Sequence, residues 1–475
     1  MKNKGLKISM VAVVALSGVL LLQGSKAVEN RSTQAGPKAE KPNIIFMLTD
    51  DQRYDALGVM GNPIIKTPHL DRLASAGILF QNAYVTTSIC CVSRASIFTG
   101  QYESRHGIHD FATDMSPQAV AQTYPALLKD AGYKIGFIGK YGVGKHPPEN
   151  LFDYWVDTEA GGKGQPDYII SDGKGHKIHD TDTIDHAIQN FLDEFGRGKT
   201  PFCLSVSFKA PHEQDGHPPK YIVQDRYKDL YKDVTIPMPV TADPVYWNKL
   251  PDFFRTDTNF ARQRWEGLFG TPALYQENVK NYYRLITGVD DVVGDMVAKL
   301  RALGLDKNTI IIYMGDNGFF LGEHGMEGKW YGYEESVRVP MLIYSPYLPD
   351  KIRQTRPRQI ALNIDIAPTI LAMAGVPAPG RMQGVNLIGL LENKVPDRSA
   401  FFYQHYFLGG KKIPREEGVV TRNFKYMKYL DFGYEELFDI THDPHETENL
   451  AGDPAYGKKL SEMRALCEKK KKESY

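Results

Sequence analysis

Two apolar runs of this 475-residue chain each end in a pair of short side chains that carry oxygen. Asp50 and Asp51 follow the run NIIFML, and Asp316 and Asn317 follow the run TIIIYM. Carboxylate and amide oxygens suit calcium or magnesium better than zinc. Each pair alone is also a common turn former. Together, the two pairs are candidate ligands for one hard divalent cation.

A cysteine lies between these pairs in the sequence, within the segment SICCVSRASIFTG at residues 88–100. The segment predicts a loop that runs into a short helix, which Gly100 ends. Cys90 stands just ahead of the N-terminus of that helix and four residues before Arg94. Because helix N-termini and guanidinium groups both bind anions, the segment is a candidate anion site that contains a thiol.

The chain has four cysteines, and they do not suggest a disulfide framework. Adjacent Cα atoms are about 3.8 Å apart, which is closer than ordinary disulfide geometry allows. Cys90 and Cys91 are therefore not expected to bridge each other. The other two cysteines, Cys203 and Cys467, lie far from this pair in the sequence.

The elements that position these residues are predicted to form an α/β fold with a large, mostly parallel sheet flanked by helices. Apolar, β-branched runs alternate with helical patterns, as such a fold requires. Ligands of parallel sheets gather beyond the carboxyl ends of the strands, where both oxygen-bearing pairs lie. The predicted strands are Asn43 to Leu48, Lys134 to Ile138, Phe202 to Phe208, Thr309 to Met314 and Val339 to Tyr344.

Two further parts of the chain have a different pattern. The segment 213–276 is rich in Pro, Tyr, Trp and Asp, is long for a connection, and is expected to build a pocket wall. Residues 385–475 are predicted to form a smaller α+β C-terminal domain with an antiparallel sheet, because FKYMKYL and EELFDI flank a turn at Phe432-Gly433. Residues 42–384 are then the main N-terminal domain.

The first 27 residues are typical of an export signal. Three lysines precede the apolar run ISMVAVVALSGVLLL, which is short for a membrane span, and Ser25-Lys26-Ala27 offers a cleavage site. We expect cleavage, a linker at residues 28–41, no stable membrane insertion afterwards and a periplasmic or extracellular location. Cleavage removes four Lys and no acid, which leaves 53 of the 57 basic residues against 57 acidic ones. This balance gives no reason to expect nucleic acid as a partner.

The segment around Cys90 resembles the sulfatase signature, in which Cys, any residue, a small residue or Pro, Ser and Arg precede an apolar pair and Thr-Gly. The resemblance extends from Pro42 to about Ala451 and implies the fold of the alkaline phosphatase superfamily and the hydrolysis of sulfate esters. Its blocks, in order, are PNIIFMLTDDQRYD, TPHLDRLASAGILFQNAYV, GYKIGFIGKYG, FKAPH, GDNGFFLGEHGMEGKW, YEESVRVP and ELFDITHDPHETENLA.

The resemblance implies a modified nucleophile and a bound metal. Cys90 would be oxidised to formylglycine (3-oxoalanine) by a formylglycine-generating maturation enzyme, and its hydrated aldehyde would attack sulfur. Arg94 would orient and stabilise this hydrate. One calcium ion would be held by Asp50, Asp51, modified Cys90, Asp316 and Asn317.

The resemblance also implies which residues bind the substrate, expected to be a sulfated polysaccharide or oligosaccharide. Lys140 and Lys329 would bind sulfate oxygens, and His212 would reach the sulfate and protonate the leaving alcohol. His324, in GEHG, would either line the substrate pocket or hydrogen-bond within its own turn. A metal ion and fixed cations aimed at the sulfate oxygens would supply most of the transition-state stabilisation.

Two positions depart from the family pattern. Val92 stands where the family usually has Pro or Ala, which bears on recognition by the maturation enzyme. Gly142, in GKYGVG, stands where most members have a His that is assigned to proton removal from the sulfated gem-diol. The elimination base is therefore unidentified, and His146 is a nearby candidate.

Other functions stay open on the sequence alone. A phosphodiesterase or phosphatase of the same superfamily would have Ser or Thr as nucleophile and more His and Asp for a two-metal zinc site, so Cys90 with Arg94 points away from it. In a non-catalytic glycan-binding relative, Cys90 would never be oxidised. A thiol hydrolase with unmodified Cys90 would leave the acidic cluster without a role.

Overall fold

The computed structural model describes residues 41–159, 165–171, 175–407 and 412–475. The predicted export signal and residues 28–40 of the predicted linker lie outside the described residues. Residues 41–475 group into one unit, and the predicted division after residue 384 stays a prediction. Among the described helices, none has the length and apolar character needed to cross a membrane.

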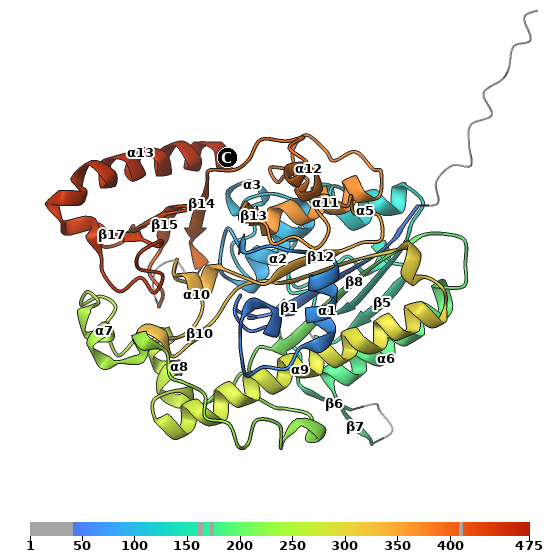
Figure 1. Ribbon diagram of the computed structural model, residues 1–475, viewed down its shortest axis with the longest axis horizontal. Coiled ribbons are helices and arrows are strands. Elements are labelled where there is room, and N and C mark those ends of the chain that lie inside the picture. The colour runs from blue at the N-terminus through green and yellow to red at the C-terminus, as the bar shows by residue number, and fades with distance from the viewer. Residues whose placement is uncertain (1–40, 160–164, 172–174, 408–411) are drawn as a thin grey trace, which may run out of the picture. The chain divides into compact units, whose positions relative to one another are not determined.

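A seven-stranded sheet forms the centre of this unit, with the strand order β2-β12-β9-β1-β8-β4-β5 (Figure 1). β9, β1, β8, β4 and β5 are parallel, whereas β12 is antiparallel to β9. All five predicted strands are present, and the prediction of a mostly parallel sheet is confirmed. The strands are β1 (Asn43–Asp50), β2 (Ile78–Leu79), β4 (Lys134–Gly139), β5 (Tyr154–Asp157), β8 (Phe202–Pro211), β9 (Thr309–Gly315) and β12 (Met341–Tyr344).

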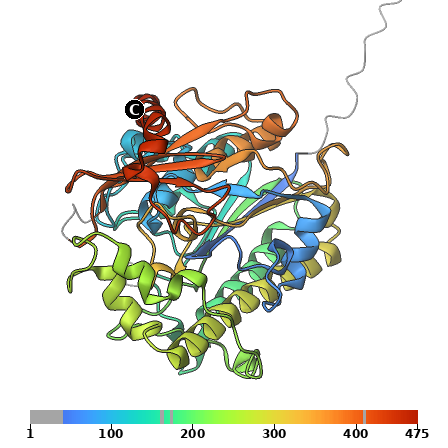
Figure 2. The ribbon, with the colours of Figure 1, turned by 60° about the vertical axis from the view of Figure 1, so that its left-hand side comes forward.

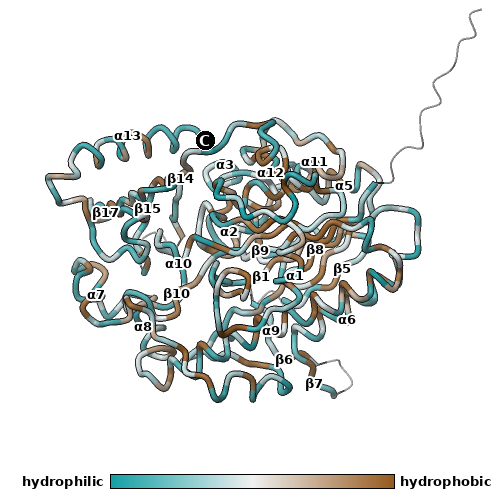
Figure 3. Tube along the Cα trace, in the orientation of Figure 1, coloured by the Kyte–Doolittle hydropathy of each residue, from teal (hydrophilic) through white to brown (hydrophobic). Residues whose placement is uncertain are grey.

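Helices cover both faces of this sheet, so β1 is buried on both sides and its sequence is continuously apolar from Ile44 to Leu48. Ile45 and Met47 pack with α1, α6 and α9 on one face, and Ile44 and Phe46 pack with α2, α5, α11 and α12 on the other. Figure 2 shows α6 and α9 on the face of the sheet to which Ile45 and Met47 belong. Figure 3 shows the apolar residues concentrated along the central strands. The helices are α1 (Pro68–Ala76), α2 (Cys90–Thr99), α5 (Tyr124–Asp130), α6 (Asp180–Phe195), α9 (Pro272–Ala302), α11 (Ile366–Met373) and α12 (Leu387–Leu391).

The long helix α9 begins at Pro272, well before the run DDVVGDMVAKLRA in its C-terminal half. Thr271 caps it by accepting a hydrogen bond from the backbone N–H of Leu274, and Pro272 is its first residue. The segment before it, which is long for a connection, contains two short helices, α7 (Pro244–Lys249) and α8 (Phe260–Leu268).

A four-stranded antiparallel sheet lies in the C-terminal part, and its last two strands are the predicted hairpin. Phe402 and Tyr426 face helix α13, whereas Phe401 faces Cys91 and Val92 of α2. The C-terminal sheet therefore supports the start of the helix that carries Cys90. These elements are β14 (Ala400–His405), β15 (Glu416–Thr421), β16 (Phe424–Tyr429), β17 (Tyr434–Asp439) and α13 (Gly457–Ser474).

Shorter elements complete the described ranges. The strands are β3 (Asn82–Tyr84), β6 (Ile169–Ser171), β7 (Lys177–His179), β10 (Phe320–Leu321), β11 (Glu327–Gly328) and β13 (Ile360–Leu362). The helices are α3 (Glu103–His106), α4 (Pro117–Val120) and α10 (Glu334–Val337).

Candidate active site

The predicted site residues meet at the carboxyl edge of the central sheet. Asp50 ends β1, Asp316 follows β9, Lys140 follows β4 and His212 follows β8. Since β9, β1, β8 and β4 are consecutive neighbours and parallel, their carboxyl ends lie together. The sheet order therefore gathers residues that are far apart in the sequence.

Cys90 is the first residue of α2, one position further into the helix than the sequence indicates. The first N–H groups of a helix have no partner within it and attract anions. Its Sγ donates to Asp50 Oδ1 at 3.1 Å and accepts from Lys329 Nζ at 3.3 Å. Burial and the charge of Asp50 raise the pKa of Cys90 well above its usual value. An unmodified Cys90 thus stays a thiol, which argues against a thiolate hydrolase.

Arg94 lies below the site and is 1% exposed. Its Nε donates to Asp316 Oδ2 at 2.9 Å, and its Nη1 donates to the carbonyl oxygen of Lys140 at 2.6 Å and to Ser207 Oγ. Its Nη2 lies 3.6 Å from Asp50 Oδ2 and has no hydrogen-bond partner among the described residues. Arg94 therefore ties together the ends of three strands. No sequence pattern indicated a role for Ser207.

Two buried lysines approach the carboxylates from different elements. Lys140 Nζ lies 2.5 Å from Asp50 Oδ2, and Lys329 Nζ, after β11, lies 2.5 and 2.6 Å from the two oxygens of Asp51. Burial alone would lower their pKa values, but the neighbouring carboxylates raise both. Both side chains therefore remain cationic beside Cys90 and are suited to bind an anion.

His212 reaches the same place from the end of β8. Its Nδ1 lies 2.6 Å from the carbonyl oxygen of Glu213 and must therefore carry a hydrogen, which leaves Nε2 facing the site. That Nε2 lies 3.4 Å from Asp51 Oδ2 and 3.2 Å from Gln165 Nε2. Burial and the charge of Lys329 hold the pKa of His212 well below its usual value.

The acidic residues form a cluster that can hold a metal ion. Ligand atoms of Asp50, Asp51, Cys90 and His212 all lie within 4.8 Å of one another. Burial raises the pKa of Asp51 to about 6 and, with the charge of Asp50, raises that of Asp316 to about 7. A buried carboxylate with a raised pKa is one that a cation would stabilise in its charged form.

Asn317 lies beside these carboxylates and supports the same interpretation. Its Nδ2 donates to Asp51 Oδ1 at 2.5 Å, while its Oδ1 is buried with no hydrogen-bond partner in the described part of the chain. Buried oxygens nearly always have a partner. A set of carboxylate oxygens with an additional amide oxygen fits a hard divalent cation.

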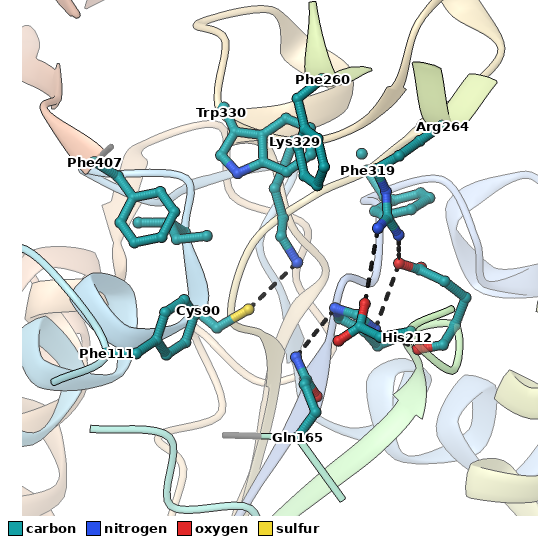
Figure 4. A pocket seen from close by; sticks show the side chains of 14 residues that line it. Cys90, Phe111, Gln165, His212, Phe260, Arg264, Phe319, Lys329, Trp330 and Phe407 are labelled. Carbon is teal, nitrogen blue, oxygen red and sulfur yellow. Dashed lines mark hydrogen bonds and ion pairs between the residues drawn. The ribbon is translucent and has the colours of Figure 1, made fainter. Parts of the chain in front are cut away.

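A cavity of about 330 Å³ opens above Cys90. In Figure 4, Phe111 and Phe407 lie on one side of Cys90, and His212 and Arg264 lie on the other. The sequence did not single out most of the residues of its walls, which come from separate segments of the chain. The lining residues are Ile89, Cys90, Phe111, Gln165, His212, Glu213, Asp215, Phe260, Arg264, Phe319, Gly328, Lys329, Trp330 and Phe407.

His324 lies apart from this group. It is buried in the turn between β10 and β11 and lines a separate cavity of about 360 Å³ together with Tyr333 and Glu436. Its ring centroid is 4.6 Å from that of Tyr333, and burial lowers its pKa to about 3. The predicted role of His324 in the substrate pocket gains no support from this placement.

The surroundings of Gly142 do not supply a replacement base at His146. Gly142 has a φ of +71°, and a Cβ there would lie 2.8 Å from Arg94 Cδ, so Arg94 occupies that space. The side chain of His146 is 83% exposed, bonds Asp114 Oδ2 at 2.8 Å and lies outside the cavity at Cys90.

We therefore predict that His146→Ala keeps sulfate release within about twofold of the unchanged protein, as is usual for exposed side chains outside a site. His212→Ala is the matched comparison, and its loss should be about 10² to 10⁴-fold if His212 is the general acid. Initial rates on one sulfate ester measure both. A tenfold lower rate of sulfate release in His146→Ala would contradict this prediction and support His146 as the elimination base.

The geometry of the site is that of a hydrolase. Cations that converge on a buried residue beside a metal-binding cluster are suited to hydrolyse esters of an anion, because they stabilise charge that develops on its oxygens.

Similarity to known proteins identifies which family of hydrolases this is. The Sulfatase family model matches residues 42–376, and the model described as N-sulphoglucosamine sulphohydrolase, C-terminal, matches residues 322–473. The chain therefore belongs to the sulfatase family and is a sulfatase. This identification accords with the alkaline phosphatase-like fold.

Three similar proteins illustrate the relationship. An N-acetylglucosamine-6-O-sulfatase of Bacteroides thetaiotaomicron is 32% identical, over 92% of this chain and 88% of its own length. An ulvan-active sulfatase of Formosa agariphila is 29% identical, over 98% of this chain and 88% of its own length. A protein solved in complex with its substrate D-glucosamine-2-N,6-O-disulfate is 29% identical with a TM-score of 0.76, and the match covers 91% of this chain and 98% of that one.

Proposed function

We propose that this sulfatase removes sulfate from a sulfated carbohydrate, with formylglycine at position 90 and one calcium ion. The observation that carries the proposal is a set of three buried cations at Cys90 and the carboxylates beside it. Lys329 donates to Cys90, Lys140 donates to Asp50, and Arg94 donates to Asp316. The substrates named for the similar proteins favour a sulfated carbohydrate as the substrate. Residues 42–384 are proposed as the catalytic domain, residues 385–475 as the C-terminal domain, and residues 1–27 as a cleaved export signal.

The surroundings of Cys90 suit a modified residue with an oxygen in place of Sγ. Formylglycine supplies a hydrated aldehyde, which is the nucleophile. Asp50 Oδ1 is placed to accept a hydrogen bond from a hydroxyl at this position, and Lys329 Nζ is placed to donate to it. Because Cys90 is 1% exposed, the maturation enzyme must reach it before the chain has folded. Val92 is fully buried as well, so its effect on maturation also belongs to the unfolded chain.

The chain's own cations then bind and orient the sulfate group. Lys140 and Lys329 stay charged in the buried site and are placed to hold sulfate oxygens. His212 presents Nε2 to the cavity. Because burial and Lys329 lower its pKa, Nε2 carries no proton before the sulfate group binds. To act as the general acid, the ring must take up a proton when the sulfate group binds, since an anion beside it raises its pKa. Positioned proton transfer of this kind is typically worth about 10² to 10⁴ in rate.

The acidic cluster is proposed as a calcium site. Its oxygen-rich ligand set and the unpartnered Asn317 Oδ1 favour a hard cation over zinc. When bound, calcium supplies positive charge at a sulfate oxygen. The ligands would be Asp50, Asp51, residue 90, Asp316 and Asn317.

The cavity suggests a sugar as the group that carries the sulfate. Aromatic side chains form much of its wall, and aromatic faces pack well against the C–H faces of a sugar ring. A volume of about 330 Å³ lies near the lower end of small-molecule sites, which favours one sugar residue at this place. The name of one relative and the description of one solved structure both specify a 6-O-sulfated glucosamine unit, so such a sugar is the first substrate to test.

A desulfation screen tests the proposal with matured protein and defined glycosaminoglycan and algal oligosaccharides. The expected result is release of inorganic sulfate from at least one carbohydrate. A phosphate monoester and a phosphodiester serve as controls for the other branch of the superfamily. Faster hydrolysis of either control than of every sulfate ester would contradict the proposal.

A further inference from the structure

One wall of the cavity at Cys90 carries more negative than positive charge. Arg264 pairs with Glu213 and lies 2.7 Å from Glu327 Oε2 and 3.7 Å from Asp215 Oδ1. The side chains of Glu213 and Glu327 are 1% and 0% exposed, and that of Arg264 is 14% exposed. One guanidinium thus faces three carboxylates; Glu213 and Asp215 line the cavity, whereas Glu327 does not. Since it is already shared among them, Arg264 is not free to bind an anionic group of a ligand.

The same wall offers an unused hydrogen-bond acceptor. Glu213 Oε2 is buried, belongs to a residue that lines the cavity, and has no partner among the described residues. Trp330 Nε1 is a buried donor without a partner in the described ranges, and Trp330 lines the same cavity. Because buried polar atoms are nearly always satisfied, these two atoms indicate a ligand that both donates and accepts hydrogen bonds.

The position of the wall identifies the part of the substrate that meets it. Glu213 directly follows His212 and accepts its Nδ1–H through the backbone carbonyl. Glu327 lies two residues before Lys329. The wall therefore adjoins both the residue that would protonate the leaving alcohol and one that would bind sulfate. A group next to it belongs to the sugar that carries the scissile sulfate.

We propose that Glu213 and Asp215 form a specificity wall that selects a hydrogen-bond donor on that sugar and rejects a second anionic group. A hydroxyl, amide N–H or ammonium group would donate to Glu213 Oε2. A second sulfate or a carboxylate would face like charge and find no free cation there. This inference rests on the proposed function, because it assumes that a sugar sulfate enters the cavity.

The test compares matched sugars that share one sulfate. Rates are measured as kcat/KM on glucosamine-6-sulfate, N-acetylglucosamine-6-sulfate and glucosamine-2-N,6-O-disulfate, and on galactose-6-sulfate against galactose-2,6-disulfate. We expect at least a tenfold preference for the monosulfated members of whichever series is hydrolysed. Equal or faster hydrolysis of the disulfated members would overturn the proposal that this wall rejects a second anionic group. Release from no carbohydrate of the desulfation screen would instead overturn the proposed function together with it.

Two substitutions connect the preference to the wall. Asp215→Asn removes a charge from a half-exposed side chain, and Glu213→Gln keeps the shape of a buried one. Each should reduce the preference for monosulfated sugars several-fold, while Asp215→Glu should keep it. Because the readout is a ratio between two substrates of the same variant, partial loss of folding cancels. An unchanged ratio in both neutral variants would overturn the assignment.

Discussion

Cys90→Ala should abolish sulfate release, whereas Cys91→Ala should retain most of it. Cys90 Sγ lies against Asp50 and Lys329, but Cys91 packs in the apolar cluster that faces the C-terminal sheet. Loss of a nucleophile costs about 10⁴-fold or more in comparable enzymes. Sulfate release is measured on protein produced together with a maturation system.

Mass analysis of the same protein tests the chemistry independently of the assay. Peptide mapping should find the aldehyde at residue 90 and an unmodified thiol at residue 91. The Cys91→Ala variant controls for the loss of a buried side chain, because both cysteines are almost fully buried. An aldehyde at residue 91, or full activity in Cys90→Ala, would refute the mechanism. An unmodified, inactive protein that binds glycans would instead favour a non-catalytic relative.

The residues that follow strands could be predicted from the sequence, because one physical rule places them. Asp50 and Asp316 each follow an apolar run, and the parallel strands β1 and β9 are neighbours, so both carboxylates reach the same edge. Lys140 and His212 follow β4 and β8 in the same way. The rule does not fix the hydrogen bonds, and no pattern indicated that Ser207 accepts from Arg94.

Spacing in the sequence does not decide the direction of a side chain that a turn sets. His324 stands five residues before Lys329, yet the short strands β10 and β11 put Lys329 at the Cys90 cavity and His324 in another. His146 stands four residues after Gly142 but points to solvent.

The cavity walls could not be predicted because they assemble through tertiary packing alone. Phe111, Phe260, Trp330 and Phe407 come from four distant segments. An aromatic residue in a loop is more often part of a core than of a binding site, so composition does not distinguish the two. The expectation that segment 213–276 builds a pocket wall agrees with the placement of Glu213, Asp215, Phe260 and Arg264, although it identified none of them.

Asp316→Ala should lose bound metal and activity together. Asp316 is fully buried, accepts from Arg94 Nε at 2.9 Å and from the backbone N–H of Asp51 at 3.1 Å. Its removal takes away one proposed oxygen ligand and releases Arg94 from its position. Metal catalysis is worth several kcal/mol, so sulfate release should fall by about 10³-fold or more. Elemental analysis after dialysis measures calcium per chain alongside the rate.

A second buried aspartate provides the matched control. Asp290 accepts hydrogen bonds from the backbone N–H groups of His69 and Leu70, and it belongs to a different cluster with His69 and Asp291. Burial raises its pKa to about 7, as it does for Asp316. Asp290→Asn should therefore keep one calcium per chain and near-normal activity, because its cluster lies outside the cavity at Cys90. If Asp290→Asn loses the metal while Asp316→Ala keeps it, the metal belongs to the other cluster. Full activity after exhaustive chelation, or one zinc per chain, would exclude calcium at Asp316, since an oxygen-rich site selects hard cations.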